Sequence, residues 1–243
     1  QVAENLYMRR DYMDTIFKTI RESDLNPRLE YKYSDLPYYI LKKYLEAKFG
    51  KPMELIVQEN LYESLGANYT TYLPLEKFSK DNIPPTEQDN IFRNQKVQGY
   101  VHDQGAAMLG GVSGHAGLFS NANDVAKIMQ MYLWKGFYGG KRYFNPDILD
   151  LFNTCYYCDK NVRRGVGFDK PQLGTSGPTC GCVSMTSFGH SGFTGTFAWA
   201  DPEQDIVYVF LSNRTFPDAE NRKLIKSDLR SKIQEAIYEA IDY

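Results

Sequence analysis

Two short motifs carry most of the chemistry that this sequence offers. They are Tyr33-Ser34-Asp35 near the start and His190-Ser191-Gly192 in the last quarter of the chain. A tyrosine beside small polar residues is common where a helix begins and is usually structural, so its surroundings must decide its role. An unperturbed phenol, with a pKa of about 10, acts as a base near neutral pH only if positive charge lowers that pKa or a lysine shares the proton.

No serine in the chain lies in a complete nucleophile motif. Ser113 and Ser191 occur in runs that approach Gly-x-Ser-x-Gly, but each run lacks the final glycine and neither follows the strand-then-helix order of a nucleophile elbow. Thr15 and Lys18 imitate Ser-x-x-Lys with a threonine, inside a helical pattern that already explains them. The chain also has no His-Glu-x-x-His and no phosphate-binding glycine loop, so metalloprotease and nucleotide-binding functions lack support.

Composition predicts a globular protein that does not bind nucleic acid. The 243 residues are 42% apolar and 14% aromatic, which is enough to build a packed core. The 28 basic and 30 acidic side chains nearly balance, and no run rich in lysine and arginine stands out. No apolar stretch approaches the length of a membrane span. The start, Gln1-Val2-Ala3-Glu4, resembles neither a signal peptide nor an initiator methionine, and we expect an excised piece of a longer protein.

Four cysteines lie close together in sequence and leave three states open. They form two pairs, Cys155-x-x-Cys158 and Cys180-x-Cys182. The second pair is tighter than a usual zinc knuckle, which favours disulfides or free thiols over zinc without deciding between them. Disulfides would fit an extracytoplasmic protein.

The first two thirds of the chain is predicted to be mainly helical. Apolar residues recur at helical spacing in several segments, and the first of these is expected to pack on a core. Asp35 is expected to cap the second helix, and Asn123 and Asp124 the fourth. A long surface loop is predicted over 68–104 and a turn over 110–117. The predicted helices cover residues 11–22, 35–50, 52–66, 123–135 and 146–152.

The last third is predicted to be an antiparallel sheet with a terminal helix. Short runs rich in aromatic and β-branched residues indicate strands over 165–168, 188–191, 196–200 and 206–211. An amphipathic pattern from about 220 to 241 predicts a helix that covers one face of that sheet.

The surroundings of both motifs resemble one known superfamily. The run from Tyr33 through Gly50-Lys51-Pro52 to Leu65-Gly66 resembles the second-motif region of class C β-lactamases, D-alanyl-D-alanine carboxypeptidases and related esterases. The stretch from Gly189 to Thr196 resembles their third motif, which is Lys-Thr-Gly in many members and His-x-Gly in some. The segments 101–103 and 114–120 resemble a loop-and-helix block of the same superfamily, so that the resemblance runs from about residue 11 to 243.

The resemblance implies a role for each motif residue. Tyr33 takes the position of the base that removes a proton from an attacking serine, and His190 replaces the usual lysine, holding an anionic substrate group or tuning Tyr33. Gly192 lets the substrate backbone come close, and the amide of Phe193 is one oxyanion-hole donor. Ser191 and Thr194 complete the third motif as supporting residues. Asp35 departs from the asparagine usual in the second motif, and its charge would disfavour a tyrosinate.

The resemblance also implies an α+β fold of the β-lactamase/transpeptidase type in truncated form. We expect a single partial domain over 1–243, with a mainly helical part over 1–160 and antiparallel strands and a C-terminal helix over 161–243. His102 and His115 are expected to order loops by hydrogen bonding to backbone. The missing Ser-x-x-Lys motif normally supplies the nucleophile.

We therefore expect a fragment of a serine hydrolase that cleaves an amide or ester through an acyl-enzyme, inactive as given. The alternative is a non-catalytic module that binds peptidoglycan or carbohydrate. Neither reading needs a cofactor, a metal or nucleic acid. An exposed sheet edge predicts a homodimer, and an extracytoplasmic, bacterial location is expected.

Overall fold

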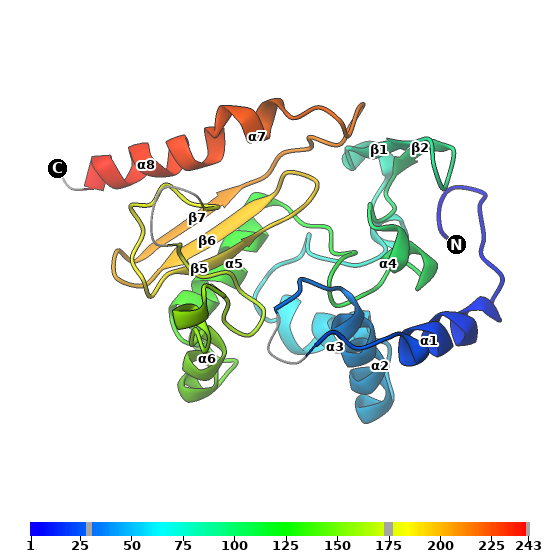
Figure 1. Cartoon of the computed structure of the whole chain (residues 1–243), viewed down its shortest axis with the longest axis horizontal. Coiled ribbons are helices and arrows are strands. Elements are labelled where there is room, and N and C mark those ends of the chain that lie inside the picture. The colour runs from blue at the N-terminus through cyan, green and yellow to red at the C-terminus, as the bar shows by residue number, and fades with distance from the viewer. Residues whose placement is uncertain (28–30, 173–176, 242–243) are drawn as a thin grey trace. The chain divides into compact units, whose positions relative to one another are not determined.

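The computed structural model describes residues 1–27, 31–172 and 177–241 (Figure 1). The chain divides into two compact units. Unit 1 contains Gln1–Tyr62, Thr70–Phe119 and Phe216–Asp218, and unit 2 contains Glu63–Tyr69, Ser120–Thr215 and Ala219–Tyr243. The α+β class expected from the sequence is confirmed. Among the described residues, no helix combines the length and apolar character that crossing a bilayer requires.

Unit 1 is mainly helical with one hairpin. Its helices are α1 (Tyr12–Glu22), α2 (Leu36–Phe49), α3 (Met53–Val57) and α4 (Gln104–Met108), and its hairpin strands are β1 (Pro85–Asp89) and β2 (Gln95–Gln98). A π-helical turn at Gln58–Tyr62 continues α3, and short 3₁₀ turns lie at Pro74–Glu76 and Lys80–Asn82. A small core of Val2, Val101, Ala106 and Ala107 lies beneath α4.

The first two helices form where the sequence predicts them, but two details of the prediction are wrong. None of the residues of α1 is buried, although its apolar face was expected to pack on a core. Helical spacing shows that a helix has an apolar face and not that anything covers it. The side chain of Asp35 makes no capping hydrogen bond at α2. Instead Ser34 Oγ accepts one from the Leu36 amide, at 3.3 Å.

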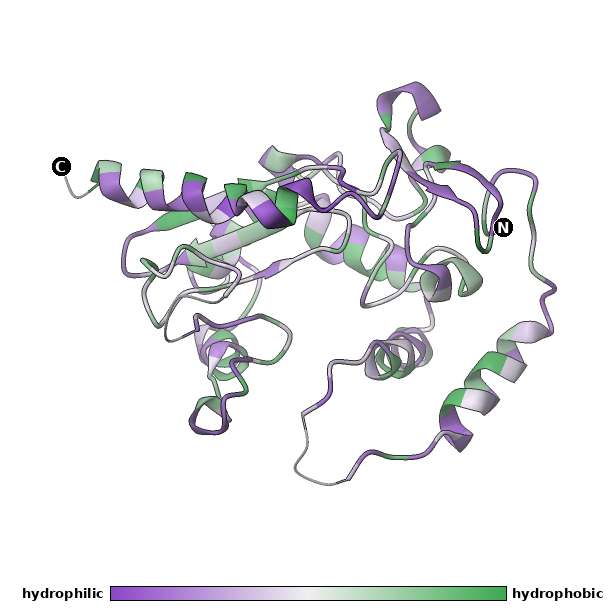
Figure 2. Ribbon diagram, turned by 45° about the horizontal axis from the view of Figure 1, so that its top comes forward, coloured by the Kyte–Doolittle hydropathy of each residue, from purple (hydrophilic) through white to green (hydrophobic). Residues whose placement is uncertain are grey.

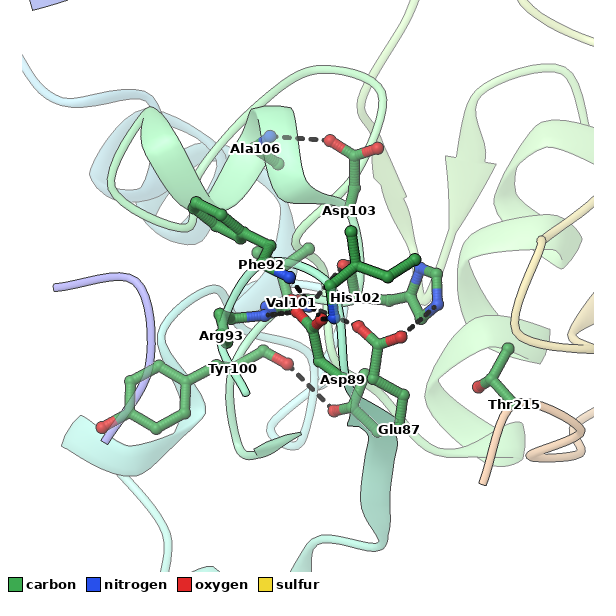
Figure 3. A network of polar contacts seen from close by, with 12 residues as sticks. Glu87, Asp89, Phe92, Arg93, Tyr100, Val101, His102, Asp103, Ala106 and Thr215 are labelled. Carbon is green, nitrogen blue, oxygen red and sulfur yellow. Dashed lines mark hydrogen bonds and ion pairs between the residues drawn. The ribbon is translucent and has the colours of Figure 1, made fainter. Parts of the chain in front are cut away.

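The hairpin of β1 and β2 lies inside the segment that was predicted to be a long surface loop. Its inward side chains alternate along β1 as a strand requires, but they are Glu87 and Asp89 rather than apolar residues. Arg93, whose side chain is fully buried, neutralises them (Figure 3). A search for alternating apolar residues misses such a strand because the buried partners are charged.

Arg93 organises this hairpin through several hydrogen bonds. Its Nε donates to Asp89 Oδ2 at 2.7 Å, and its Nη groups donate to Glu87 and to the carbonyls of Val101 (2.6 Å) and His102 (2.8 Å). Burial opposes ionisation of Asp89, but hydrogen bonds from the Phe92 amide, the Arg93 side chain and the Ile91 amide lower the pKa of Asp89 to about 2. The carboxylate therefore stays charged inside the unit.

Unit 2 is a three-stranded antiparallel sheet between helices. Its strands are β5 (Phe188–Ser191), β6 (Phe197–Asp201) and β7 (Ile206–Phe210), in the order β5-β6-β7. The helices are α5 (Ala122–Leu133), α6 (Pro146–Asn153), α7 (Lys223–Ser227) and α8 (Leu229–Ile241), and a short hairpin joins β3 (Phe137–Tyr138) to β4 (Lys141–Arg142). A 3₁₀ turn covers Cys158–Lys160.

The two faces of the sheet bury different side chains. On one face Phe197, Trp199 and Tyr208 pack against Ile233 and Ile237 of α8. On the other face Phe188 and Ala200 pack against α5 through Met129 and Leu133. Hydrophobic residues alternate with hydrophilic ones along α8 (Figure 2). The predicted cover of one face by the terminal helix is confirmed.

The other sequence predictions in unit 2 hold with small changes. Asn121, rather than Asn123 or Asp124, caps α5, because its Oδ1 accepts from the Asp124 amide. The terminal helix is broken at Asp228, whose φ of 55° is left-handed. Residues 165–168 do not form a strand element, although isolated bridges flank them. Both cysteine pairs are disulfides, which settles the alternatives left open by their spacing.

Replacing Arg93 by methionine should destabilise the protein by about 3–5 kcal/mol, because it leaves two buried carboxylates without a counter-charge. Chemical unfolding of the variant and the parent chain measures this loss. Arg9→Met removes an exposed ion pair with Asp11 and serves as the control, with little change expected. Equal stability of the two variants would contradict the role assigned to Arg93.

Candidate active site

The Tyr33-Ser34-Asp35 motif lies directly before the start of α2 in unit 1. The Tyr33 side chain is 61% exposed, and Ser34 and Asp35 are partly buried. The short connection into α2, with Pro37 in the first turn, fixes the direction in which the helix leaves the motif. Tyr33 is thus presented at the surface of its unit.

A cluster of polar groups surrounds Asp35. Ligand atoms of Asp35, Asp103 and His115 all lie within 4.8 Å of one another. The ring of Tyr39 packs on that of His115 with centroids 4.8 Å apart. Burial, followed by the negative charges of Asp103 and Asp35, raises the pKa of Tyr39 to about 12. The surroundings of the Tyr33-Ser34-Asp35 motif are therefore acidic in this chain.

Among the described residues, the carboxylates of Asp35 and Asp103 and the imidazole of His115 form a group that could hold a divalent cation. His115 Nε2 and Asp103 Oδ1 are already paired at 2.9 Å, and Asp103 Oδ1 also accepts from the Ala106 amide at 2.6 Å, capping α4. The hydrogen bond from His115, opposed by burial and helped by the Ala106 amide, lowers the pKa of Asp103. These bonds account for the cluster as an element that orders the loop.

Ser113, His115 and Asp103 form a hydrogen-bonded chain that resembles a catalytic triad. Ser113 Oγ lies 2.9 Å from His115 Nδ1, and His115 Nε2 lies 2.9 Å from Asp103 Oδ1. The Ser113 side chain is completely buried, so no carbonyl carbon can reach it. The array is structural. His115 orders its loop as expected, but it does so through hydrogen bonds to side chains and not to the backbone, so that part of the prediction was wrong.

The His190-Ser191-Gly192 motif begins at the end of β5 and continues into a tight turn in unit 2. His190 pairs with Ala198 and Ser191 with Phe197 in the β5–β6 register. Gly192 donates its amide to the Thr196 carbonyl at 2.8 Å, and a Cβ at this position would come within 2.2 Å of Thr196 Oγ1. A side chain at this position would therefore have to displace the Thr196 hydroxyl, which adds a local reason for glycine to the substrate approach that the resemblance implies.

The remaining motif residues lie on this turn. The Phe193 side chain is 65% exposed, and the Arg214 guanidinium lies 4.4 Å from its ring centroid. The Thr194 carbonyl accepts a hydrogen bond from the Arg214 amide at 2.9 Å. Arg214 therefore contacts the turn through both its side chain and its backbone amide.

Two charged residues beside His190 were missed by the sequence analysis. Arg164 Nη1 lies 2.9 Å from His190 Nε2, and Arg164 Nε forms an ion pair with Asp169 Oδ1 at 3.0 Å. His190 Nδ1 lies 2.8 Å from the Ser191 carbonyl. The structure thus joins His190 to Arg164 and Asp169. The only signal in the sequence was the pair of arginines before Gly165, which local patterns do not connect to a strand far along the chain.

Lys170 is a further buried cation next to β5. Its Nζ donates to Asn153 Oδ1 and to the Thr186 carbonyl, each at 2.9 Å. Only 4% of the residue is exposed, and burial lowers the pKa of Lys170 to about 8. This lysine loses its proton far more readily than a lysine in water.

The lowered pKa of Lys170 predicts a gain of stability with rising pH. Between about pH 8 and the ordinary lysine pKa of 10.5 the unfolded chain holds a proton that the folded chain has lost. The free energy of unfolding should therefore rise with pH in this window, relative to a Lys170→Met variant. Urea unfolding from pH 7 to 9.5 measures it, with Lys96→Met at an exposed site as the control. Parallel pH profiles for the parent and Lys170→Met would refute the prediction.

Comparisons with known proteins agree on one family. The family model described as Beta-lactamase matches residues 2–230. An Escherichia coli K12 protein named "Putative D-alanyl-D-alanine carboxypeptidase" is 36% identical over 204 residues, which cover 79% of this chain and 46% of that protein. A Salmonella gallinarum protein of the same name is 32% identical over 225 residues, covering 86% of this chain and 52% of that protein. The chain thus spans about half the length of the curated relatives it matches.

Solved structures show the same fold at low sequence identity. A β-lactamase of Mycobacterium bovis has a TM-score of 0.57 and 19% identity, over 86% of this chain and 64% of that one. Simvastatin synthase of Aspergillus terreus has a TM-score of 0.61 and 15% identity, over 94% of this chain and 62% of that one. With the family model spanning most of its length, this chain belongs to the β-lactamase family, within the superfamily of serine β-lactamases and penicillin-binding proteins.

Proposed function

We propose that this chain is the part of a serine hydrolase that handles the proton and the anionic end of the substrate, in a D-alanyl-D-alanine carboxypeptidase or esterase type of reaction. The observation that carries the proposal is the presence of both Tyr33-Ser34-Asp35 and His190-Ser191-Gly192 in a chain of the β-lactamase family. Tyr33 takes the proton of an attacking hydroxyl, and the amide of Phe193 donates to the developing oxyanion.

The remaining residues of the two motifs have supporting roles in this proposal. Arg164, the hydrogen-bond partner of His190, holds the anionic group of the substrate beside the imidazole. Gly192 leaves room for the substrate backbone, and Ser191 and Thr194 shape the turn around it. Asp35 lies beside Asp103 and His115 at the start of α2 and adds negative charge there.

We further propose that the chain as given does not form an acyl-enzyme. No Ser-x-x-Lys occurs among its 243 residues. Ser113 is completely buried, and Ser191 occurs in a strand-to-turn segment rather than in the strand-to-helix turn of a nucleophile elbow. The chemistry of the family needs an activated serine that a substrate carbonyl can reach. Ser113 has a histidine partner but is buried, and the run around Ser191 lacks the nucleophile elbow.

Intact-mass spectrometry after incubation with a fluorescent penicillin and, separately, a fluorophosphonate tests for a nucleophile. We expect the unmodified mass with both probes. A stoichiometric adduct on any serine would place the nucleophile inside these 243 residues and overturn the proposal of an inactive chain.

A peptide titration tests the substrate class. We expect an N-acetylated peptide ending in D-alanyl-D-alanine to shift the imidazole signals of His190 in NMR spectra and to leave those of His102 and His115 in place. The same peptide with L-alanines is the control. Equal shifts with both peptides, or none with either, would contradict a carboxypeptidase-type site.

The alternative is a non-catalytic module that binds peptidoglycan or carbohydrate. The acidic surroundings of the first motif favour it, because Asp35 and Asp103 disfavour a tyrosinate close by. Tyr33→Phe should leave muropeptide binding unchanged in either case. The two functions differ in the longer protein, where the same substitution would abolish hydrolysis only if Tyr33 acts as a base.

Three further expectations from the sequence are kept as part of this proposal. The two disulfides favour an oxidising, extracytoplasmic compartment of a bacterium. The chain is taken as one partial domain. The outer edge of β7, which pairs with no other strand in the described part of the chain, favours a homodimer. Light scattering over a concentration series measures dimer formation, and a monomer at all concentrations would count against it.

A further inference from the structure

We propose that Arg164 is a positioning residue that holds His190 as a neutral imidazole protonated at Nδ1, so that the permanent positive charge beside the His-Ser-Gly motif is a guanidinium. The inference rests on the proposed function only in giving His190 a place beside the substrate. The geometry that supports it lies entirely within unit 2.

Backbone pairing brings Arg164 to His190. Arg164 and Asp169 form a bridge across the turn between them, and Asp169 forms a second bridge with Gly189 of β5. The Asp169 amide donates to the Gly189 carbonyl at 2.8 Å, and the Gly189 amide donates back at 3.2 Å. Gly189 directly precedes His190, so the two bridges place the arginine side chain against the imidazole.

The chemistry of the two partners of His190 fixes where its proton lies. A guanidinium has donors and no acceptor, so Arg164 Nη1 must donate and His190 Nε2 must offer its lone pair. A carbonyl oxygen can only accept, so His190 Nδ1 must donate to the Ser191 carbonyl. Both bonds require the same tautomer, and a proton on Nε2 would set two donors against each other at 2.9 Å.

Asp169 keeps the guanidinium in this position. Its carboxylate lies 3.0 Å from Arg164 Nε and 3.9 Å from Arg163 Nη1, and the residue is only 5% exposed. An arginine anchored through Nε at a buried carboxylate has little freedom to turn away from the imidazole. Arg163, in contrast, donates its Nη1 to the Lys170 carbonyl at 3.0 Å.

This arrangement gives Arg164, rather than His190, the charge that would hold an anionic substrate group. The neutral imidazole, with its Nε2 lone pair engaged, is neither the cation of the site nor a proton donor through Nε2. The cation beside the motif is the guanidinium of Arg164. Substrates with a carboxylate group near the motif would therefore meet a guanidinium rather than an imidazolium.

Long-range ¹H–¹⁵N NMR spectra of the imidazoles read the tautomer directly. The chain has only three histidines, and His190→Gln identifies the signals of His190. At about pH 8, above the ordinary histidine pKa of about 6.5, we expect a pyrrole-type Nδ1 and a pyridine-type Nε2 for His190 in the parent chain. Arg164→Met should shift the population towards the Nε2-protonated tautomer that free histidine prefers in water, and Arg164→Lys should restore part of the Nδ1-protonated form.

Arg163→Met is the matched control, because it removes the same charge from the neighbouring residue and leaves the His190 contact intact. A pyridine-type Nδ1 in the parent chain would overturn the proposal, and this measurement needs no variant to fold. An unchanged tautomer in a folded Arg164→Met chain would also overturn it. Neither outcome depends on the peptide titration, so a failure here is distinct from a failure of the proposed function.

Discussion

A guanidinium group can donate hydrogen bonds but cannot accept them, and this constraint determines the chemistry beside the His190-Ser191-Gly192 motif. Because Arg164 contacts His190 Nε2, the imidazole has to present a lone pair there and carry its proton on the opposite nitrogen. The position of Arg164 depends in turn on Asp169, which joins the arginine's turn to β5 by backbone bridges and holds the guanidinium by charge. The candidate site therefore depends on long-range pairing as much as on the motif.

Each unit uses an arginine where a loop has to be held, fully buried in unit 1 and partly exposed in unit 2. In unit 1 Arg93 neutralises Glu87 and Asp89 and also binds two backbone carbonyls. In unit 2 Arg164 links Asp169 to His190. Arginine suits this task because its planar group donates in several fixed directions at once, so that one side chain sets the position of several segments. Removing such a residue leaves charged or polar groups buried without partners, which is costly.

The sequence predicted regular elements with apolar faces and missed those built on charge. Strands β5, β6 and β7 were found within a residue or so because they lie in short runs rich in aromatic and β-branched residues. The end of α2 was found because Gly50 caps it, with a φ of 64° that favours glycine. The hairpin of β1 and β2 was missed because its buried residues are carboxylates. Spacing could not decide the state of the cysteines, since the same spacing suits a disulfide, a free thiol or a metal ligand.

The motifs themselves were found from sequence, but their partners were not. Tyr33 and His190 stood out through the order of residues around them, whereas Arg164 and Asp169 carry no local signal and become neighbours of His190 only through the sheet.

The most direct test of the account is neutron diffraction from a deuterated crystal of this chain, which locates the proton on His190. The account predicts deuterium on Nδ1, directed at the Ser191 carbonyl, and none on Nε2. Deuterium on Nε2 would contradict it.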